Sequence, residues 1–211
     1  MTETVSPGGA SSRGASSGGA QRRQRADAQR NVGALLAAAK AVFATSGVDA
    51  PAKEIADAAG VGVGTLYRHF PQRSDLVKAV IQHGVDACAD AAPALAAEHN
   101  PAEALARWLH RCTEFVATKR GLATALHSGD PAYAALPGYF MGRLEPALGS
   151  LLEAAIASGE IRADVSAEDL LYAVANLCLP VPGGGVRYSQ RMVGLLIDGL
   201  RYGAGTSESR P

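Results

Sequence analysis

Hydrophobic side chains recur at three- and four-residue spacing along most of this chain, which is the period of an amphipathic α-helix. The first apolar stripe contains Val32, Leu35, Leu36, Ala39, Val42 and Phe43. Gly47 follows this stripe, and a glycine in the left-handed conformation is a common helix terminator. The pattern therefore predicts an ordered helix that begins near Asp27 and ends before Gly47.

Two short helices are predicted next, at about residues 51–58 and 62–69. Pro51 suits a first helical turn because its missing N–H would be unpaired there. Gly60 makes the turn between the two helices, since a residue without a Cβ adopts positive φ without a clash, and Pro71 stops the second helix. Two short helices joined by a tight glycine-containing turn, after a longer supporting helix, predict a helix-turn-helix.

The rest of the chain is also predicted to be helical. Ser166 is expected to cap one of these helices, with Asp169 three residues later as a variant of the capping box, and Pro146 is expected to bend another. The apolar stripes place further helices at residues 76–88, after Pro101, at 119–128, at about 137–158, after Ser166 and at about 187–203. The predicted fold is all-α, with about nine helices.

Charge is distributed unevenly, although the 211 residues hold 20 Lys/Arg and 20 Asp/Glu. Residues 1–80 hold ten Lys/Arg against six Asp/Glu, whereas residues 81–211 hold ten against fourteen. The first part is therefore the better candidate for a polyanionic partner. We expect a disordered basic tail over 1–27, a helix-turn-helix domain over 28–75, a helical ligand-binding and dimerisation domain over 76–205, and a flexible tail over 206–211.

Several kinds of chemistry find little support in the sequence. Cys88, Cys112 and Cys178 have no metal-binding spacing, and we interpret them as buried small side chains in a reducing cytosol. No apolar stretch is long enough to span a bilayer, and the N-terminal residues lack the apolar core of a signal peptide. Phosphate-loop, nucleophile-elbow and metalloprotease motifs are missing. We expect a cytoplasmic protein that is not an enzyme and uses no metal or cofactor.

The segment "AKEIADAAGVGVGTLYRHFPQRSDLVKAV", residues 52–80, resembles the DNA-binding segment of TetR-type (TetR/AcrR) transcriptional regulators. The resemblance is specific over roughly residues 28–80. It implies a double-stranded DNA operator as partner. It also implies a divergent all-helical C-terminal domain that forms a homodimer through its last two long helices and binds a small molecule.

The second short helix supplies most of the candidate DNA contacts. Gly62 and Gly64 allow close approach of the backbone to DNA, with N–H groups for phosphates, or they only relax a turn. Arg68 pairs with guanine or stays in solvent, and Tyr67 reaches a phosphate or belongs to the core. The resemblance implies phosphate contacts from His69 and Arg73. The full set is Arg30, Lys53, Gly62, Val63, Gly64, Thr65, Tyr67, Arg68, His69 and Arg73.

Two departures from the resemblance affect base recognition. Ala50, Pro51 and Ala52 stand where many relatives have Ser or Thr at the start of the first short helix, and Gly62 and Val63 replace polar residues. Fewer bases are then read by hydrogen bonds. Contact of Val63 with a thymine methyl, and DNA shape, carry more of the specificity.

A set of apolar residues with a few polar groups forms the candidate ligand pocket. Each of these residues is equally well explained as core at helical spacing. Asn176 lines the pocket or makes a hydrogen bond across a dimer interface. The set is Trp108, Cys112, Phe115, Phe140, Met141, Leu144, Tyr172 and Asn176.

We interpret the chain as a ligand-responsive transcriptional regulator. It would be a repressor that binds a palindromic operator as a dimer and is released by an apolar or amphipathic small molecule. The alternative is a helical small-molecule-binding or scaffold protein with weak or lost DNA binding, and the missing polar residues at the two short helices favour it. The salt dependence of DNA binding discriminates between them.

Overall fold

The computed structural model describes residues 17–118, 129–179, 181 and 184–202. Within these ranges the chain is helical and has no strand, which confirms the all-α prediction. The helices are α1 (Ser17–Ser46), α2 (Ala52–Ala58), α3 (Val63–His69), α4 (Arg73–Ala89), α5 (Ala92–Glu98), α6 (Pro101–Thr118), α8 (Leu136–Ala157), α9 (Ala167–Leu177) and α10 (Val186–Arg201), with a 3-10 turn η2 at Pro131–Tyr133.

Helices α2 and α3 form the predicted helix-turn-helix, and backbone hydrogen bonds at Gly60 fix the turn. Gly60 has φ +69°. Its N–H donates to the carbonyl of Asp57 at 3.1 Å, and the N–H of Val61 donates to the carbonyl of Ala56 at 3.0 Å. This pair of bonds is a Schellman motif, which ends a helix through a left-handed residue. Gly47, with φ +78°, follows the end of α1 as expected.

The predicted helix positions agree with the structure only in part. Helix α1 begins at Ser17, not near Asp27, because the Ala, Gln and Arg residues between them are good helix formers. Helix α5 was missed, since its sequence "APALAAE" is mostly alanine and shows no apolar stripe. The helix predicted at 119–128 and the tail at 206–211 lie outside the described residues. Ser166 caps α9 as predicted, accepting a hydrogen bond from the N–H of Asp169 at 3.0 Å.

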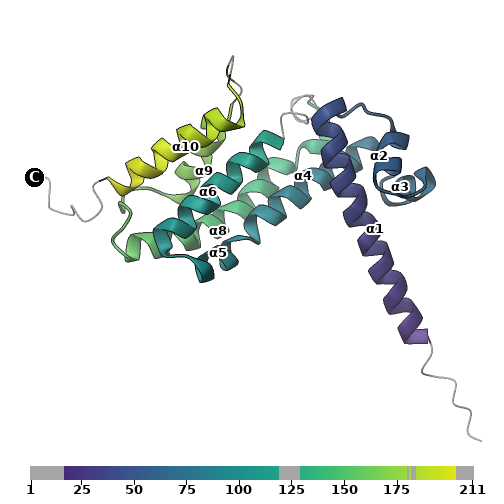
Figure 1. The fold of residues 1–211 in the computed structure, drawn as a ribbon, viewed down its shortest axis with the longest axis horizontal. Helices are drawn as coiled ribbons and strands as arrows, with labels where there is room; N and C mark the ends of the chain where they lie inside the picture. The colour runs from purple at the N-terminus through teal and green to yellow at the C-terminus, as the bar shows by residue number, and fades with distance from the viewer. Residues whose placement is uncertain (1–16, 119–128, 180, 182–183, 203–211) are drawn as a thin grey trace, which may run out of the picture.

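Two hydrophobic clusters stabilise the fold, and α4 belongs to both. The first cluster joins α1, α2, α3 and the first half of α4, including Val77 and Ile81; the second joins α4 from Val85 onward to α5, α6, α8, α9 and α10. Figure 1 shows α4 running from the helix-turn-helix at one end into the larger helical body. The boundary that we expected at residues 75 and 76 therefore lies in the first turn of a continuous helix.

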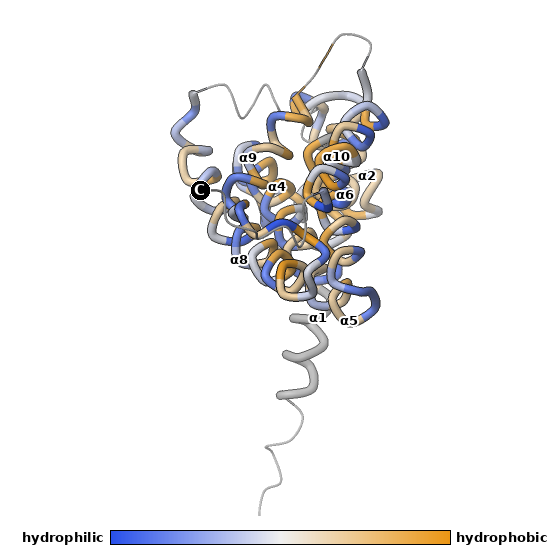
Figure 2. Tube along the Cα trace, turned by 90° about the vertical axis from the view of Figure 1, so that its left-hand side faces the viewer, coloured by the Kyte–Doolittle hydropathy of each residue, from blue (hydrophilic) through white to orange (hydrophobic). Residues whose placement is uncertain are grey.

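Hydropathy alternates along the helices, as Figure 2 shows, because each helix buries one face. Helix α8 reaches across both clusters at its N-terminal end. Leu136 is buried in the first cluster, Leu144 is buried in the second, and Phe140 packs against both. The two parts of the molecule are thus joined by side chains of α8 as well as by the continuous helix α4.

Candidate nucleic-acid interface and apolar cavity

Helix α3 buries one face and presents the other to solvent. Leu66 is buried on the inner face, together with Phe70 just after the helix. On the outer face Tyr67 is 53% exposed, so its ring does not belong to the core. The other exposed residues of this segment are Gly62, Gly64 and Arg68, while Val63, Thr65 and His69 are half-buried. An exposed helix face of this kind can enter the major groove of DNA.

The surface around α3 carries positive charge. No Asp or Glu occurs between Asp57 and Asp75, whereas Arg68 and Arg73 both lie in this stretch and are exposed. Lys53 on α2 forms an ion pair with Asp57 at 2.6 Å, but both side chains are more than half exposed. Such an exposed pair is weak, so the ammonium of Lys53 can exchange its partner for a phosphate. Arg30 is exposed on α1.

Arg73 has a structural contact that the sequence did not indicate. Its Nη2 donates a hydrogen bond to the backbone carbonyl of Ala50, in the segment between α1 and α2. A second bond ties α1 to α2, since the Ser46 hydroxyl donates to Glu54 Oε1 at 3.0 Å. Arg73 therefore braces the helix-turn-helix against the start of α4. The rest of its guanidinium stays exposed and has further donors for a phosphate.

An apolar cavity of about 230 Å³ lies in the larger helical body. Helices α6, α8 and α9 line it, and six of the eight predicted pocket residues are among its walls: Cys112, Phe115, Phe140, Met141, Leu144 and Tyr172. Its other walls are Val116, Pro137, Leu171, Val174 and Ala175. A hollow with almost wholly apolar walls suits an apolar or amphipathic small molecule.

Two of the predicted pocket residues lie elsewhere. Trp108 is fully buried in the second cluster, where its Nε1–H donates to the Cys88 carbonyl at 2.9 Å. Asn176 is exposed, and its side-chain amide donates to the Tyr172 carbonyl one turn earlier on α9 at 2.8 Å. Asn176 therefore does not line this cavity, because its position falls on the exposed face of α9, and its hydrogen bond across a dimer interface stays a prediction.

A polar cluster joins α4 to α8. The hydroxyl of Tyr139 and the Nε of Arg143 both donate to Asp86 Oδ1 at 2.7 Å, and Arg143 Nη2 donates to Asp90 Oδ1 at 2.7 Å. Burial by itself would raise the pKa of Asp86, but the hydrogen bonds from Tyr139 and Arg143 outweigh it and lower that pKa. Burial and the bond to Asp86 raise the pKa of Tyr139.

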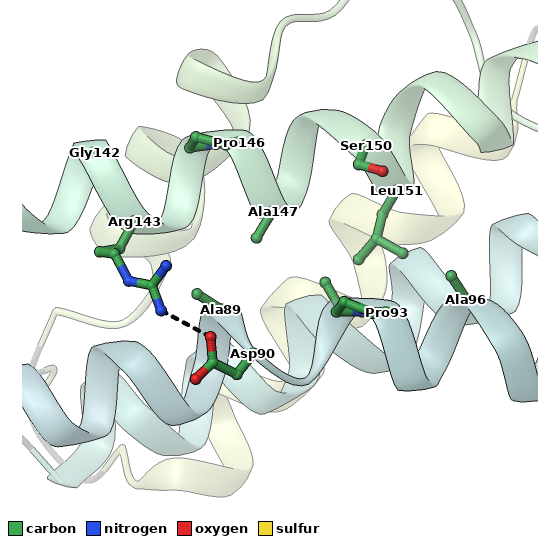
Figure 3. Close-up of a pocket in the computed structure, with 11 residues that line it drawn as sticks. Ala89, Asp90, Pro93, Ala96, Gly142, Arg143, Pro146, Ala147, Ser150 and Leu151 are labelled. Carbon is green, nitrogen blue, oxygen red and sulfur yellow. Dashed lines mark hydrogen bonds and ion pairs between the residues drawn. The ribbon is translucent and has the colours of Figure 1, made fainter.

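A second hollow, of about 440 Å³, lies between α8 and the consecutive helices α4 and α5. Figure 3 shows the ion pair of Arg143 and Asp90 at one end of it. Its remaining walls are small or apolar side chains such as Pro93, Ala147 and Leu151. This hollow was not expected from the sequence. The hydrophobic periodicity shows which side of each helix is buried, but it does not show which helices face one another.

The described residues meet neither the requirements of a metal site nor those of a membrane-spanning helix. No group of three or more His, Cys, Asp or Glu side chains that could hold a metal ion occurs in that part of the chain. No helix within the same ranges is long and apolar enough to cross a membrane.

The fold and the exposed face of α3 define a helix-turn-helix DNA-binding protein. Residues 35–80 match the family model described as bacterial regulatory proteins, tetR family, and residues 100–202 match that of the C-terminal domain of SbtR-like transcriptional regulators. The chain is similar to the TetR transcriptional regulator SCO0520 from Streptomyces coelicolor, a crystal structure, with 39% sequence identity and a TM-score of 0.69. The match covers 81% of this chain and 98% of that one. The chain belongs to the TetR family of transcriptional regulators.

Two curated relatives match over a shorter stretch. The HTH-type transcriptional regulator SAR0097 of Staphylococcus aureus is 39% identical over 69 residues, which is 31% of this chain and 36% of that protein. The HTH-type transcriptional activator FasR of Mycolicibacterium smegmatis is 43% identical over 70 residues, 33% of this chain and 32% of that protein. The chain thus matches about a third of the length of each.

Proposed function

We propose that this chain is a transcriptional repressor that binds a palindromic operator as a homodimer and is released by an apolar or amphipathic small molecule. The observation that carries the DNA-binding part is the outer face of α3, where Tyr67 and Arg68 are exposed and acidic side chains are missing. A phenol and a guanidinium on one exposed helix face can reach phosphates and base edges together.

A dimer is needed because one helix-turn-helix reads only a few base pairs. Large apolar side chains are exposed on the last helices and in the segment that joins them, and these are the helices through which the resemblance implies dimerisation. They include Leu195 at 62%, Leu179 at 58% and Tyr172 at 54% exposure. Large exposed apolar side chains on these elements favour an interaction surface there. A twofold pairing through it would present two copies of α3 to two half-sites.

The cavity supports control by a small molecule. Phe140 lines the cavity and packs against the cluster that holds the helix-turn-helix. A ligand that displaces this ring therefore acts on both parts of the molecule. A coupling of about 1–3 kcal/mol between the two sites is enough for regulation.

The first experiment measures DNA binding directly. Purified protein is mixed with DNA from upstream of its own gene, and gel mobility is followed across a series of salt concentrations. A DNA-binding regulator loses affinity steeply, by a slope of about −0.9 for each phosphate contact in a plot of log affinity against log salt. Unchanged mobility at low salt favours the alternative, a helical small-molecule-binding or scaffold protein without DNA affinity.

Arg68→Ala tests which atoms of DNA this arginine contacts. A phosphate contact predicts uniformly weaker binding and a salt slope smaller by about 1, whereas a guanine contact predicts a loss of about 1–3 kcal/mol and relaxed preference at one base pair. Arg111→Ala, an exposed arginine on α6, is the matched control and should leave binding unchanged. Equal effects from the two variants would contradict the placement of DNA on α3.

The direction of regulation is tested with a reporter gene under the bound DNA. A repressor lowers expression, and an added effector restores it. FasR is named as an activator, and higher expression in the presence of this chain would assign it the activating role instead.

A further inference from the structure

Two buried cysteines from different helices lie in direct contact beside the cavity. Cys88 is near the end of α4 and Cys112 is on α6, and their Sγ atoms are 3.2 Å apart. No disulfide joins them in the structure, and they are only 2% and 3% exposed. Since a disulfide bond is about 2.05 Å long, the two sulfurs need to approach by little more than an ångström to form one.

Helix α6 holds Cys88 at two points. Trp108 donates a hydrogen bond to the Cys88 carbonyl at 2.9 Å, and Cys112, four residues later on the same face of α6, touches the Cys88 sulfur. This arrangement fixes the two thiols against each other. A fixed pair of reactants gains a large rate advantage over a bimolecular reaction.

The two cysteines differ in their access to small molecules. Cys112 is one of the described residues that line the cavity, whereas Cys88 is not. A molecule in the cavity therefore meets Cys112 first. Because the walls are almost wholly apolar, the cavity favours a reagent that carries a hydrocarbon group.

We propose that Cys88 and Cys112 form a disulfide in response to an organic hydroperoxide that enters the cavity. The Cys112 sulfur attacks the O–O bond; an S–O bond forms, the alcohol leaves, and Cys112 becomes a sulfenic acid. The Cys88 sulfur then attacks the Cys112 sulfur; the S–S bond forms, the S–O bond breaks, and the hydroxyl group leaves as water with the Cys88 proton. Two thiols are oxidised, and one hydroperoxide is reduced to an alcohol and water.

This site goes beyond the proposed function, since the reaction requires the cavity but not DNA. Intracellular disulfides are usually transient and redox-sensing. The bond would draw the end of α4 toward α6. It would thus act on the helix that also carries part of the first hydrophobic cluster.

The experiment treats the full-length reduced protein with cumene hydroperoxide, blocks the remaining thiols, and maps tryptic peptides by mass spectrometry. Cleavage places Cys88 in peptide 79–107, Cys112 in 112–119 and Cys178 in 163–187. We expect peptides 79–107 and 112–119 to become linked, and Cys178→Ser to leave the link unchanged. Failure to link them, a link through Cys178, or a link between two chains would overturn the proposal.

Two further variants test the order of the steps and the route of access. In Cys88→Ser the sulfenic acid at Cys112 should persist and be trapped by dimedone; no adduct at Cys112 would overturn the proposed order. Ala175→Trp narrows the cavity wall at an exposed position and should slow linkage severalfold. Ala97→Trp, exposed on α5, is the matched control. Equal rates in the two Trp variants would overturn access through the cavity, even if the serine variant failed to fold.

Discussion

The ring of Phe115 on α6 lies against Gly84 on α4. A Cβ at residue 84 would stand 2.7 Å from Cε2 of Phe115 and 2.9 Å from Cδ2. Phe115 also lines the apolar cavity. The missing side chain of Gly84 therefore lets a wall of the cavity rest directly on the helix that leads to the helix-turn-helix.

Gly84→Ala is expected to push the Phe115 ring into the cavity. Alanine favours a helix over glycine by about 1 kcal/mol, but overpacking costs about 1–3 kcal/mol, so the free energy of unfolding should fall by about 1 kcal/mol. Binding of the apolar dye anilinonaphthalene sulfonate, measured by fluorescence titration, should weaken. Gly33→Ala on α1, where a Cβ meets open space, is the control and should stabilise the protein. Unchanged dye affinity together with higher stability in Gly84→Ala would contradict the contact.

The local features of the helix-turn-helix could be predicted from the sequence because neighbouring residues determine them. Gly60 forms its turn with carbonyls only a few positions away, and Pro71 stops α3 whatever packs around it. Such features need no knowledge of distant partners. The exposed state of Tyr67 is different, since the sequence left open whether this ring reaches a phosphate or belongs to the core, and only the packing of α3 decides it.

Contacts between distant helices could not be predicted, because periodicity reports which face of a helix is buried but not what covers it. Trp108 and Cys112 share one face of α6, yet Trp108 contacts the Cys88 carbonyl whereas Cys112 lines the cavity. The ion pair of Arg143 with Asp86 joins residues 57 positions apart. Nothing in either local sequence selects the partner.

Gly64→Ala separates the two roles considered for the glycines of α3. A Cβ at this position meets nothing within 4 Å, and its φ is ordinary, so helix propensity alone should raise the free energy of unfolding by about 0.5–1 kcal/mol. If DNA approaches the backbone here, the same variant should bind DNA more weakly. Urea unfolding and gel mobility measure the two effects.

Gly60→Ala is the opposite case and the control for Gly64→Ala. Its φ of +69° is strained for alanine, so stability should fall by about 1–2 kcal/mol. A Gly64→Ala variant that gains stability and keeps full DNA affinity would show that Gly64 only relaxes the chain.

The polar cluster between α4 and α8 should make stability depend on pH. The pKa of Asp86 lies below its ordinary value of 3.8. The ionised carboxylate therefore favours the folded state above pH 3.8, and this contribution is lost as the pH falls through the lower folded pKa. Because the side chain is 37% exposed, Asp86→Asn should cost less than about 1 kcal/mol at neutral pH.

Urea unfolding across pH 3 to 7 measures the difference in the free energy of unfolding between wild type and Asp86→Asn. It should stay constant from pH 7 to about 5 and shrink below 3.8. Glu103→Gln is the control, since Glu103 pairs with Arg107 on one exposed face of α6 and its substitution leaves α4 and α8 untouched. A difference that grows as the pH falls would contradict the cluster as described.

Leu195 on α10 should decide the oligomeric state. It is 62% exposed, the most exposed leucine of the last helices, and a stable interface buries about 800 Å² per partner with an apolar centre. Leu195→Glu places a charge in that centre and should shift sedimentation from dimer to monomer. Since each monomer reads one half-site, operator affinity should fall with it. Ala97→Glu, exposed on α5, adds the same charge elsewhere and should remain dimeric. A Leu195→Glu protein that sediments as a dimer would place the interface on another surface.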